Sequence, residues 1–278
     1  MPRVSAAAFG LALGAAAVHA LWNLLIARTG DPQAATGVAM AAAVVALAPV
    51  ALVLGGLPTR ALPYIAASAA LELVYFGLLA TAYRVGELSV TYPLARGGAP
   101  VLLVAAAAAF GLGGDVTAIQ VGGVALAVAG ILAVRGARSP GGALEVGLSL
   151  AVAACIAGYT LVDRAGVRDA DPVTYLWLVL ALATPPYVAA IRLARGRGAL
   201  ARELTGAAVL AGVAMFAAYA LALAALKLAG AAEVGAVRET SVVIATALAA
   251  IVLRERISAA RWAGALAVTA GIAVIALG

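Results

Sequence analysis

Apolar residues fill this chain in long runs, interrupted at nine places by short polar, glycine- or proline-containing breaks. The runs are about 20 residues long, the length of α-helix that crosses the roughly 30 Å hydrocarbon layer of a bilayer. We therefore predict an all-α integral membrane protein. Its ten predicted transmembrane helices cover residues 4–27, 33–54, 61–83, 88–110, 116–134, 143–162, 172–191, 205–227, 232–253 and 259–277.

Composition supports this prediction. Hydrophobic residues make up 65% of the 278 residues and charged residues only 11%, too few to cover a soluble domain of this size. The net charge of +6 comes mostly from arginines in short loops, which indicates orientation in a membrane rather than nucleic-acid binding. With one cysteine, Cys155, and one histidine, an internal disulfide is excluded and little remains for a metal site. We expect no cofactor and no metal.

The first 20 residues have a basic start, an apolar centre and an A-x-A-like end, as a cleaved signal peptide has. The apolar run nevertheless continues to Ala27, and the repeat described next includes it. We therefore interpret this segment as the first transmembrane helix.

The two halves of the chain resemble each other. HALWNLLIARTGDP in the first half resembles YTLVDRAGVRDADP in the second, and residues 121–134 resemble residues 262–275. Each half, 1–138 and 139–278, contains five predicted helices. Because five is odd, the second half would be inverted relative to the first. Two inverted five-helix repeats around a midplane site are an architecture of secondary transporters.

This organisation resembles the EamA family of the drug/metabolite transporter superfamily over essentially the whole chain. The resemblance rests on the two five-helix repeats and on GDPQAATGVAM, YPLARGGAPVLL, HALWN and LRERISAARWAGALAVTAGIAV. The corresponding first-half turn, GLGGDVTAIQVGG, lacks the Glu-Arg pair of the last motif. The resemblance implies a secondary transporter, often an exporter, of small metabolites such as amino acids.

Positive charges predict the orientation in the membrane. Side A denotes the face at which the chain starts, and side B the opposite face. Side A carries five basic residues and side B eleven. They are Arg3, Arg60, Arg164, Arg168 and Lys227 on side A, and Arg28, Arg84, Arg135, Arg138, Arg192, Arg195, Arg197, Arg202, Arg254, Arg256 and Arg261 on side B. The positive-inside rule makes side B cytoplasmic and both termini extracytoplasmic, in what we expect to be a bacterial inner membrane.

Four polar residues are predicted near the middle of the membrane, each in a different helix. Arg96 lies eight residues inside the fourth helix, about 12 Å from side B at roughly 1.5 Å per residue. His19, Glu72 and Glu239 lie at similar depth in the first, third and ninth helices. An unpaired charge in hydrocarbon costs at least about 2.5–3.5 kcal/mol. We therefore expect the four side chains to face a shared cavity.

Arg96 has two interpretations, which do not exclude each other. It forms a structural ion pair with Glu72 or Glu239, or it binds an anionic group of a substrate, for which a planar guanidinium is suited. Tyr92 lies one turn earlier on the same helical face and is a candidate substrate contact. Pro93 predicts a kink, because it lacks a backbone donor.

Further candidates surround Arg96. Gly97 and Gly98 would let a helix or a ligand approach closely. His19, Trp22 and Asn23 share one face of the first helix and are candidate substrate contacts. A packed histidine and an interfacial tryptophan anchor are the structural alternatives for that face.

The leading interpretation is a secondary transporter that moves a small polar or zwitterionic metabolite by alternating access, with export favoured by the family resemblance. Glu72 and Glu239 are candidates to carry a proton or bind an amine. The alternatives are an integral membrane transferase and a structural membrane partner in which Arg96 forms a buried ion pair. The absence of a Walker sequence argues against direct driving by ATP. Both a monomer and a homodimer are compatible with the sequence.

Overall fold

In the computed structural model, the described residues are 5–54, 58–110, 117–135, 141–226, 228–229 and 231–277. All regular secondary structure among them is helical. The helices are α1 (Ala6–Ala27), α2 (Pro32–Leu54), the short 3₁₀ helix η1 (Thr59–Ala61), α3 (Leu62–Val85), α4 (Leu88–Phe110), α5 (Ala118–Arg135), α6 (Gly142–Gly166), α7 (Pro172–Arg195), α8 (Arg197–Arg202), α9 (Gly206–Leu226), α10 (Ala231–Arg238), α11 (Ser241–Val252) and α12 (Ala259–Leu277).

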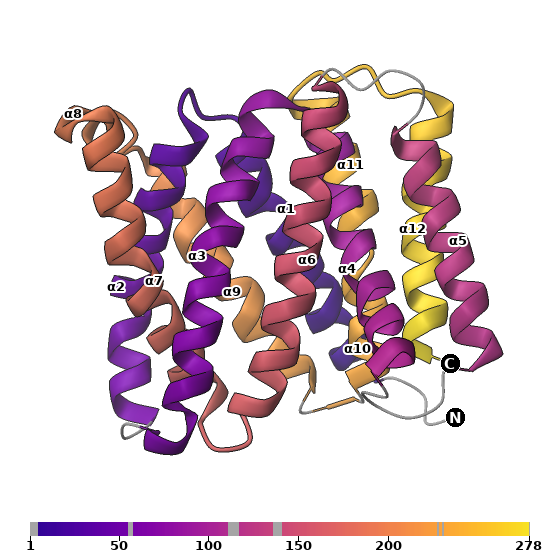
Figure 1. Ribbon diagram of the computed structural model, residues 1–278, viewed down its shortest axis with the longest axis horizontal. Helices are drawn as coiled ribbons and strands as arrows, with labels where there is room; N and C mark the ends of the chain where they lie inside the picture. Colours follow the sequence, from indigo (N-terminus) through magenta and orange to yellow (C-terminus); the bar gives the residue numbers. More distant parts are fainter. Residues whose placement is uncertain are drawn as a thin grey trace.

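The long helices stand side by side in one elongated bundle (Figure 1). Helices α5 and α12 form one end of the bundle, and α2, α7 and α8 form the other. α1 begins and α12 ends at the same face, which is side A. The α1–α2 and α3–α4 turns, α8 and the α11–α12 connection lie at side B, the upper face in Figure 1.

Nine helical segments in the described part of the chain are long and apolar enough to cross a membrane. They are Ala6–Ala27, Pro32–Leu54, Thr59–Val85, Leu88–Ala106, Ala118–Arg135, Gly142–Gly166, Pro172–Arg195, Val234–Val252 and Ala259–Leu277. Helix α9 adds a shorter apolar stretch, Gly206–Ala222. Large apolar side chains such as Val53 and Leu193 point outward and are 85% and 88% exposed. The chain is therefore an all-helical, multi-pass membrane protein.

The ninth predicted helix, 232–253, differs from the prediction because it is divided into α10 and α11. The backbone N–H of Thr240 bonds to the carbonyl of Val237 three residues earlier, and its hydroxyl donates to the same carbonyl at 2.7 Å. A side-chain hydroxyl that bonds locally competes with the helical pattern in this way. The hydroxyl of Thr269 in α12 donates to the carbonyl of Glu239 at 3.3 Å. This hydrogen bond from a neighbouring helix stabilises the interruption.

Helix α4, unlike the ninth predicted helix, is continuous. It remains helical from Leu88 to Phe110, with Pro93 and Pro100 inside it. A Cβ atom at Gly97 would lie 2.6 Å from Val268 of α12, and one at Gly98 would lie 2.9 Å from Ala153 of α6. The two glycines therefore let α4 pack closely between α12 and α6, as the sequence predicted.

Seven stretches of the chain, 1–4, 55–57, 111–116, 136–140, 227, 230 and 278, lie outside the described residues. They include the predicted side A charges Arg3 and Lys227, the side B charge Arg138 and the predicted boundary between the two halves. The predicted break at 192–203 contains the short helix α8.

Candidate functional site

Arg96 and Glu239 form an ion pair inside the bundle. Nη2 of Arg96 donates to Oε1 of Glu239 at 3.0 Å, and the two side chains are 17% and 13% exposed. The sequence left Glu72 and Glu239 as alternative partners, and the structure selects Glu239. The carboxylate lies in the two-residue break between α10 and α11, directly opposite α4. A tight turn, in which the N–H groups of Thr240 and Val242 bond to carbonyls three residues earlier, thus places Glu239 beside the arginine.

Unsatisfied polar atoms surround this ion pair. Arg96 Nε, Glu239 Oε2, the Tyr92 hydroxyl and the Ser241 hydroxyl are buried and have no hydrogen-bond partner of good geometry in the described part of the chain. Tyr92 precedes Arg96 by one turn, and Ser241 begins α11 just after Glu239. Buried polar atoms are almost always hydrogen-bonded in folded proteins. The Tyr92 and Ser241 hydroxyls lie near each other, and this group of buried donors and acceptors at membrane depth is suited to a polar ligand or bound water.

His19 belongs to the same region. Its ring centroid lies 6.2 Å from that of Tyr92. Nε1 of Trp22 donates to Nδ1 of His19 at 3.3 Å, which assigns the neutral tautomer with its proton on Nε2. Trp22 is only 3% exposed, so this residue is part of the bundle interior and not an interfacial anchor.

Asn23 connects this group to α3. Its side-chain nitrogen donates to the His19 carbonyl at 2.9 Å, and its oxygen accepts from the hydroxyl of Tyr83 at 2.6 Å. With both of its polar atoms engaged and an exposure of 2%, Asn23 fixes the position of α1 relative to α3. A supporting role for His19 suits this geometry better than direct substrate contact.

Glu72 occupies a separate aromatic environment. It is 8% exposed on α3 and forms no ion pair with a basic side chain of the described residues. Tyr75 packs against Phe76 and Tyr159 with ring centroids 4.9 and 5.7 Å apart. Asp163, which accepts a 2.9 Å hydrogen bond from a tyrosine of α7, lies on the same helix as Tyr159. Arg96, Glu239 and His19 thus lie close together, whereas Glu72 interacts with Asp163 and Tyr159 of α6.

Arg238 is a further charge that the sequence analysis did not assign to the site. It ends α10, is partly buried, and interacts electrostatically with Arg96 and His19. It forms no ion pair with another described residue. Its position next to Glu239 in the sequence is the feature that could have indicated its place in the site. With two arginines and one carboxylate, the immediate site carries an excess of positive charge.

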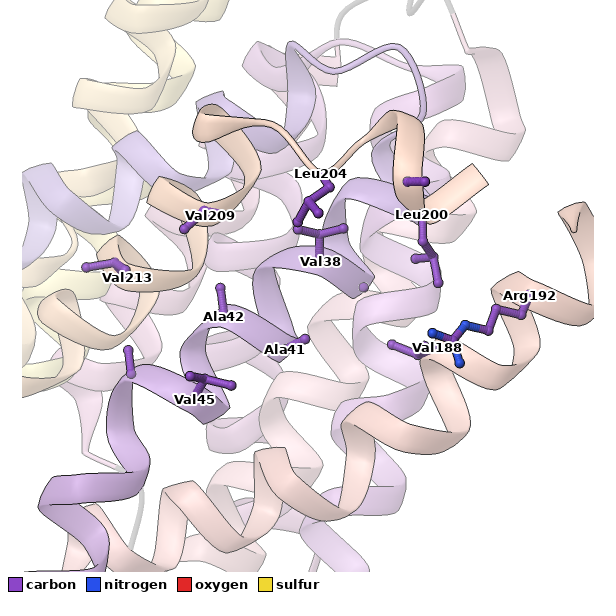
Figure 2. Close-up of a pocket in the computed structure, with 13 residues that line it drawn as sticks. Val38, Ala41, Ala42, Val45, Val188, Arg192, Leu200, Leu204, Val209 and Val213 are labelled. Atoms are coloured by element: carbon purple, nitrogen blue, oxygen red, sulfur yellow. The ribbon is translucent and has the colours of Figure 1, made fainter. Parts of the chain in front are cut away.

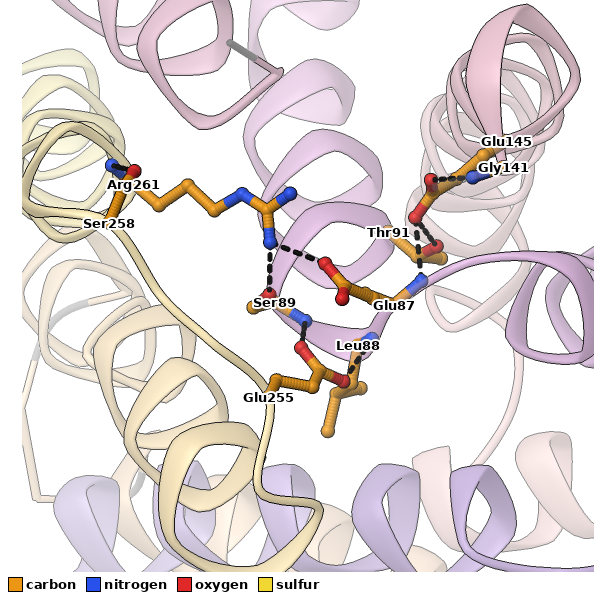
Figure 3. A network of polar contacts seen from close by, with 9 residues as sticks. All are labelled: Glu87, Leu88, Ser89, Thr91, Gly141, Glu145, Glu255, Ser258 and Arg261. Atoms are coloured by element: carbon orange, nitrogen blue, oxygen red, sulfur yellow. Dashed lines mark hydrogen bonds and ion pairs between the residues drawn. The ribbon is translucent and has the colours of Figure 1, made fainter. Parts of the chain in front are cut away.

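The side B end of α4 is held by three carboxylates (Figure 3). Glu255 accepts from the backbone N–H groups of Leu88 and Ser89 at 2.9 and 3.1 Å. Burial raises the pKa of Glu255, and these hydrogen bonds offset the effect only in part. Because a helix N-terminus presents free N–H groups and a partial positive charge, carboxylates stabilise it.

The other two carboxylates complete this network. Glu87 pairs with Arg261, whose guanidinium also lies 3.4 Å from the Ser89 hydroxyl. Glu145 is fully buried and accepts from the N–H groups of Glu87 and Gly141 at 2.8 and 3.1 Å. The α4 terminus is thereby connected to α6, to α12 and to the α11–α12 connection.

A second polar network joins helices at side B, at the other end of the bundle. Arg195 of α7 pairs with Asp31 and donates to the side chain of Gln33. Glu203 accepts from the Asp31 N–H at 2.9 Å, and Gln33 donates to Thr81 of α3 at 2.7 Å. Burial acts to raise the pKa of Asp31, but the Arg195 hydrogen bond and neighbouring backbone donors outweigh it and lower the pKa.

Each network contains residues of a motif that carries the family resemblance: Asp31 and Gln33 belong to GDPQ, and Glu255 belongs to LRERIS. No ion pair lies at side A among the residues that the structure describes. The molecule is therefore joined across its helices by charge at side B and at the centre.

Comparisons with known proteins agree with this architecture. One crystal structure of a protein is similar over 97% of this chain and 97% of its own, with 17% sequence identity and a TM-score of 0.67. At that identity the likeness concerns the fold alone. No curated protein matches the sequence. Residues 143–277 match the model of the EamA-like transporter family, which identifies the second half of the chain as EamA-like.

Proposed function

We propose that this protein is a secondary transporter that exports a small polar or zwitterionic metabolite by alternating access. The observation that carries the proposal is the Arg96–Glu239 pair at a break in a membrane helix, surrounded by unsatisfied polar atoms. Broken helices at membrane depth are tolerated where protein or a cavity surrounds them, and in transporters they often form the substrate site.

The proposed architecture is two inverted repeats, residues 1–138 and 139–278, with ten membrane crossings that include α9 and the divided α10–α11. Helix neighbours occur in matched pairs, which supports this: α1 packs on α9 as α6 packs on α3, and α2 packs on α9 as α7 packs on α3. Such reciprocal contacts are expected of a two-fold relation. The family match over 143–277 coincides with the second proposed repeat.

Helices α5 and α12 support the same relation in more detail. Aligning the two repeats pairs Gly123 with Gly264, and Gly130 with Gly271. A Cβ at Gly123 would lie 2.8 Å from the Gly271 carbonyl, and one at Gly130 would lie 2.7 Å from the Gly264 carbonyl. A two-fold axis between the helices would exchange these two contacts, because it would move Gly123 onto Gly264 and Gly271 onto Gly130.

In the proposed mechanism Arg96 binds an anionic group of the substrate, which displaces it from Glu239. Arg238 adds positive charge, and Tyr92 and Ser241 supply hydrogen bonds. Trp22 and Asn23 hold His19 at the wall of the site. A zwitterion would place its ammonium near a carboxylate, for which Glu72 beside aromatic rings is suited through charge and cation–π attraction. Glu239, once released, would be free to take up a proton and couple transport to proton flow.

The proposed orientation places side B, with its two ion-pair networks, in the cytoplasm of a bacterium. The two networks would then close the site on the cytoplasmic side. One chain contains both repeats, so a monomer suffices for the mechanism. A reporter fused to the C-terminus and active only in the cytoplasm would contradict this orientation.

The test combines ligand binding with flux. Purified protein is heated with a panel of amino acids, organic acids and amines, and ligands that raise its melting temperature are then tested for gradient-dependent flux in proteoliposomes. We expect a carboxylate-containing ligand to stabilise the wild type and not Arg96→Gln. Arg135→Gln, which removes an exposed arginine at the end of α5, is the matched control. A folded Arg96→Gln protein with unchanged ligand response and flux would refute the proposed role of Arg96.

A further inference from the structure

A deep apolar groove lies on the outer surface of the bundle, away from the ion pair (Figure 2). Its volume is about 680 Å³, within the range of roughly 300–1,000 Å³ typical of sites for drug-sized ligands. It is bounded by α2, α7, α8 and α9. The lining residues are Gly37, Val38, Ala41, Ala42, Val45, Ala46, Val188, Arg192, Leu200, Ala201, Leu204, Val209 and Val213.

The groove exists because α2 presents small side chains between two larger walls. Its floor is mostly glycine and alanine, whereas Val188 of α7 and Val209 and Val213 of α9 form the sides. Gly212 brings α9 close to α2, since a Cβ there would lie 3.0 Å from that of Ala42. Leu200 of α8 covers the side B end.

The groove faces the membrane and has the length of one leaflet. It follows α2 from Gly37 to Ala46, about 13 Å at roughly 1.5 Å per residue, which is close to half of a hydrocarbon layer of about 30 Å. Val45 and Leu204 at its opening are 73% and 69% exposed. The groove is therefore suited to bind an apolar chain from the bilayer.

Among the residues that the structure describes, Arg192 is the only charged side chain that lines this groove. It lies one turn before the side B end of α7, at the depth of lipid headgroups, and extends toward the hollow (Figure 2). It forms no ion pair with the described residues, whereas the neighbouring Arg195 is engaged with Asp31. Glu203 does not line this groove; its carboxylate accepts from the Asp31 N–H and borders a separate pocket.

We propose that this groove binds one anionic phospholipid of the side B leaflet. An acyl chain lies along α2, and the phosphate accepts hydrogen bonds from the guanidinium of Arg192. Arginine at this depth combines charge with a planar set of donors that fits a phosphate. Basic pockets between membrane helices on the cytoplasmic side bind anionic headgroups in the same manner. The proposal concerns lipid binding and does not depend on the proposed transport.

The experiment measures lipid binding to delipidated, purified full-length protein in detergent. The probes are dioleoyl phosphatidylglycerol, dioleoyl phosphatidylcholine and glycerol phosphate, and the readouts are native mass spectrometry and melting temperature. We expect one tightly held phosphatidylglycerol and a higher melting temperature with that lipid alone. Arg192→Gln should weaken its binding about fivefold, and Ala42→Phe should abolish retention by filling the floor.

Matched controls separate the groove from general effects. Arg135→Gln removes a side B arginine outside the groove, and Ala70→Phe adds an aromatic ring to an exposed position of α3; both should bind phosphatidylglycerol like the wild type. If Ala42→Phe does not fold, Ala46→Phe replaces it, because Ala46 is exposed at the groove.

Several outcomes would overturn the proposal. Equal retention of the two lipids, or equal loss of preference in Arg192→Gln and Arg135→Gln, would show a nonspecific charge effect. A melting-temperature rise with glycerol phosphate as large as with phosphatidylglycerol would show a soluble anion site. A change of oligomeric state in Ala42→Phe, with lipid retention unchanged, would assign the groove to a second copy of the chain.

Discussion

Nη2 of Arg96 and Oε1 of Glu239 lie 3.0 Å apart, although the residues are 143 positions apart in the chain. The contact joins the fourth helix of the first half to the interrupted helix of the second half. A buried ion pair is weak evidence for stability as such, but removal of one partner leaves an uncompensated charge. The pair therefore makes a specific thermodynamic prediction.

Arg96→Gln and Glu239→Gln should each destabilise the protein by about 3 kcal/mol, because each leaves one charge unpaired inside the bundle. The double variant should lose much less than the sum of the two, since no charge of the pair remains. Thermal unfolding of the four proteins in the same detergent measures the cycle. Additive losses would contradict an interaction between the two residues.

Gly130→Ala should strongly destabilise the α5–α12 contact, by about 3 kcal/mol or more. The new Cβ would lie 2.6 Å from the Val268 nitrogen and 2.7 Å from the Gly264 carbonyl oxygen, and backbone atoms cannot yield as a side chain does. Gly122→Ala, on the same helix with no atom within 4 Å, is the control and should match or slightly exceed the wild type. Similar melting temperatures for both variants would argue against the close packing.

The Asp31–Arg195 pair should contribute pH-dependent stability outside the membrane. The pKa of Asp31 is lowered from its ordinary value of 3.8, so the folded state favours the charged carboxylate. The stabilisation is present above that value and is lost as the pH falls through the lowered pKa. Asp31→Asn should therefore be less stable than the wild type at neutral pH.

The difference between Asp31→Asn and the wild type should narrow toward pH 3. Melting temperatures of both proteins across pH 3–7 provide the measurement. Glu255, whose pKa is raised, acts with the opposite sign but is common to both proteins and cancels in the difference. A constant difference across the range would show that the Asp31 carboxylate does not titrate against Arg195.

Arg261→Gln should favour opening at side B, because it removes the ion pair with Glu87 at the α4 terminus. Ser241→Cys, introduced with Cys155→Ala, reports access to the centre of the bundle. We expect a charged, membrane-impermeant thiol reagent applied from side B to label it several-fold faster when Arg261→Gln is added. Arg135→Gln should leave the labelling rate unchanged, and an equal rate in all three backgrounds would contradict a closing role for Arg261.

Apolar run length predicted most of the helices well. The predicted 61–83 and 259–277 correspond to Leu62–Val85 and Ala259–Leu277. The interruption at Glu239 and Thr240 could not be predicted, because neither glycine nor proline marks it. It depends on the Thr240 hydroxyl and on Thr269 of α12, and contacts of that kind follow from tertiary packing.

Depth in the membrane was the useful guide to the site, and it was incomplete. It placed Arg96, Glu239, His19 and Glu72 at one level but gave no rotation of the helices about their axes. Arg96 consequently pairs with Glu239, whereas Glu72 interacts with Asp163 of α6. The side B networks were missed because residues such as Arg261 appear in short polar connections, which in sequence are indistinguishable from solvated loops.

The side B networks have a consequence for the energy of the two conformations in the proposed cycle. In a perfectly two-fold chain, a rotation about the two-fold axis would exchange the states open to side A and to side B, and the two states would have equal free energy. The ion pairs of Arg195 and Arg261 have no counterparts at side A among the described residues, so they remove this degeneracy. A free-energy difference of about 1.4 kcal/mol between the two states changes the ratio of their populations tenfold. If the proposed two-fold relation holds, the polar connections at side B would thus set the resting state of the proposed cycle.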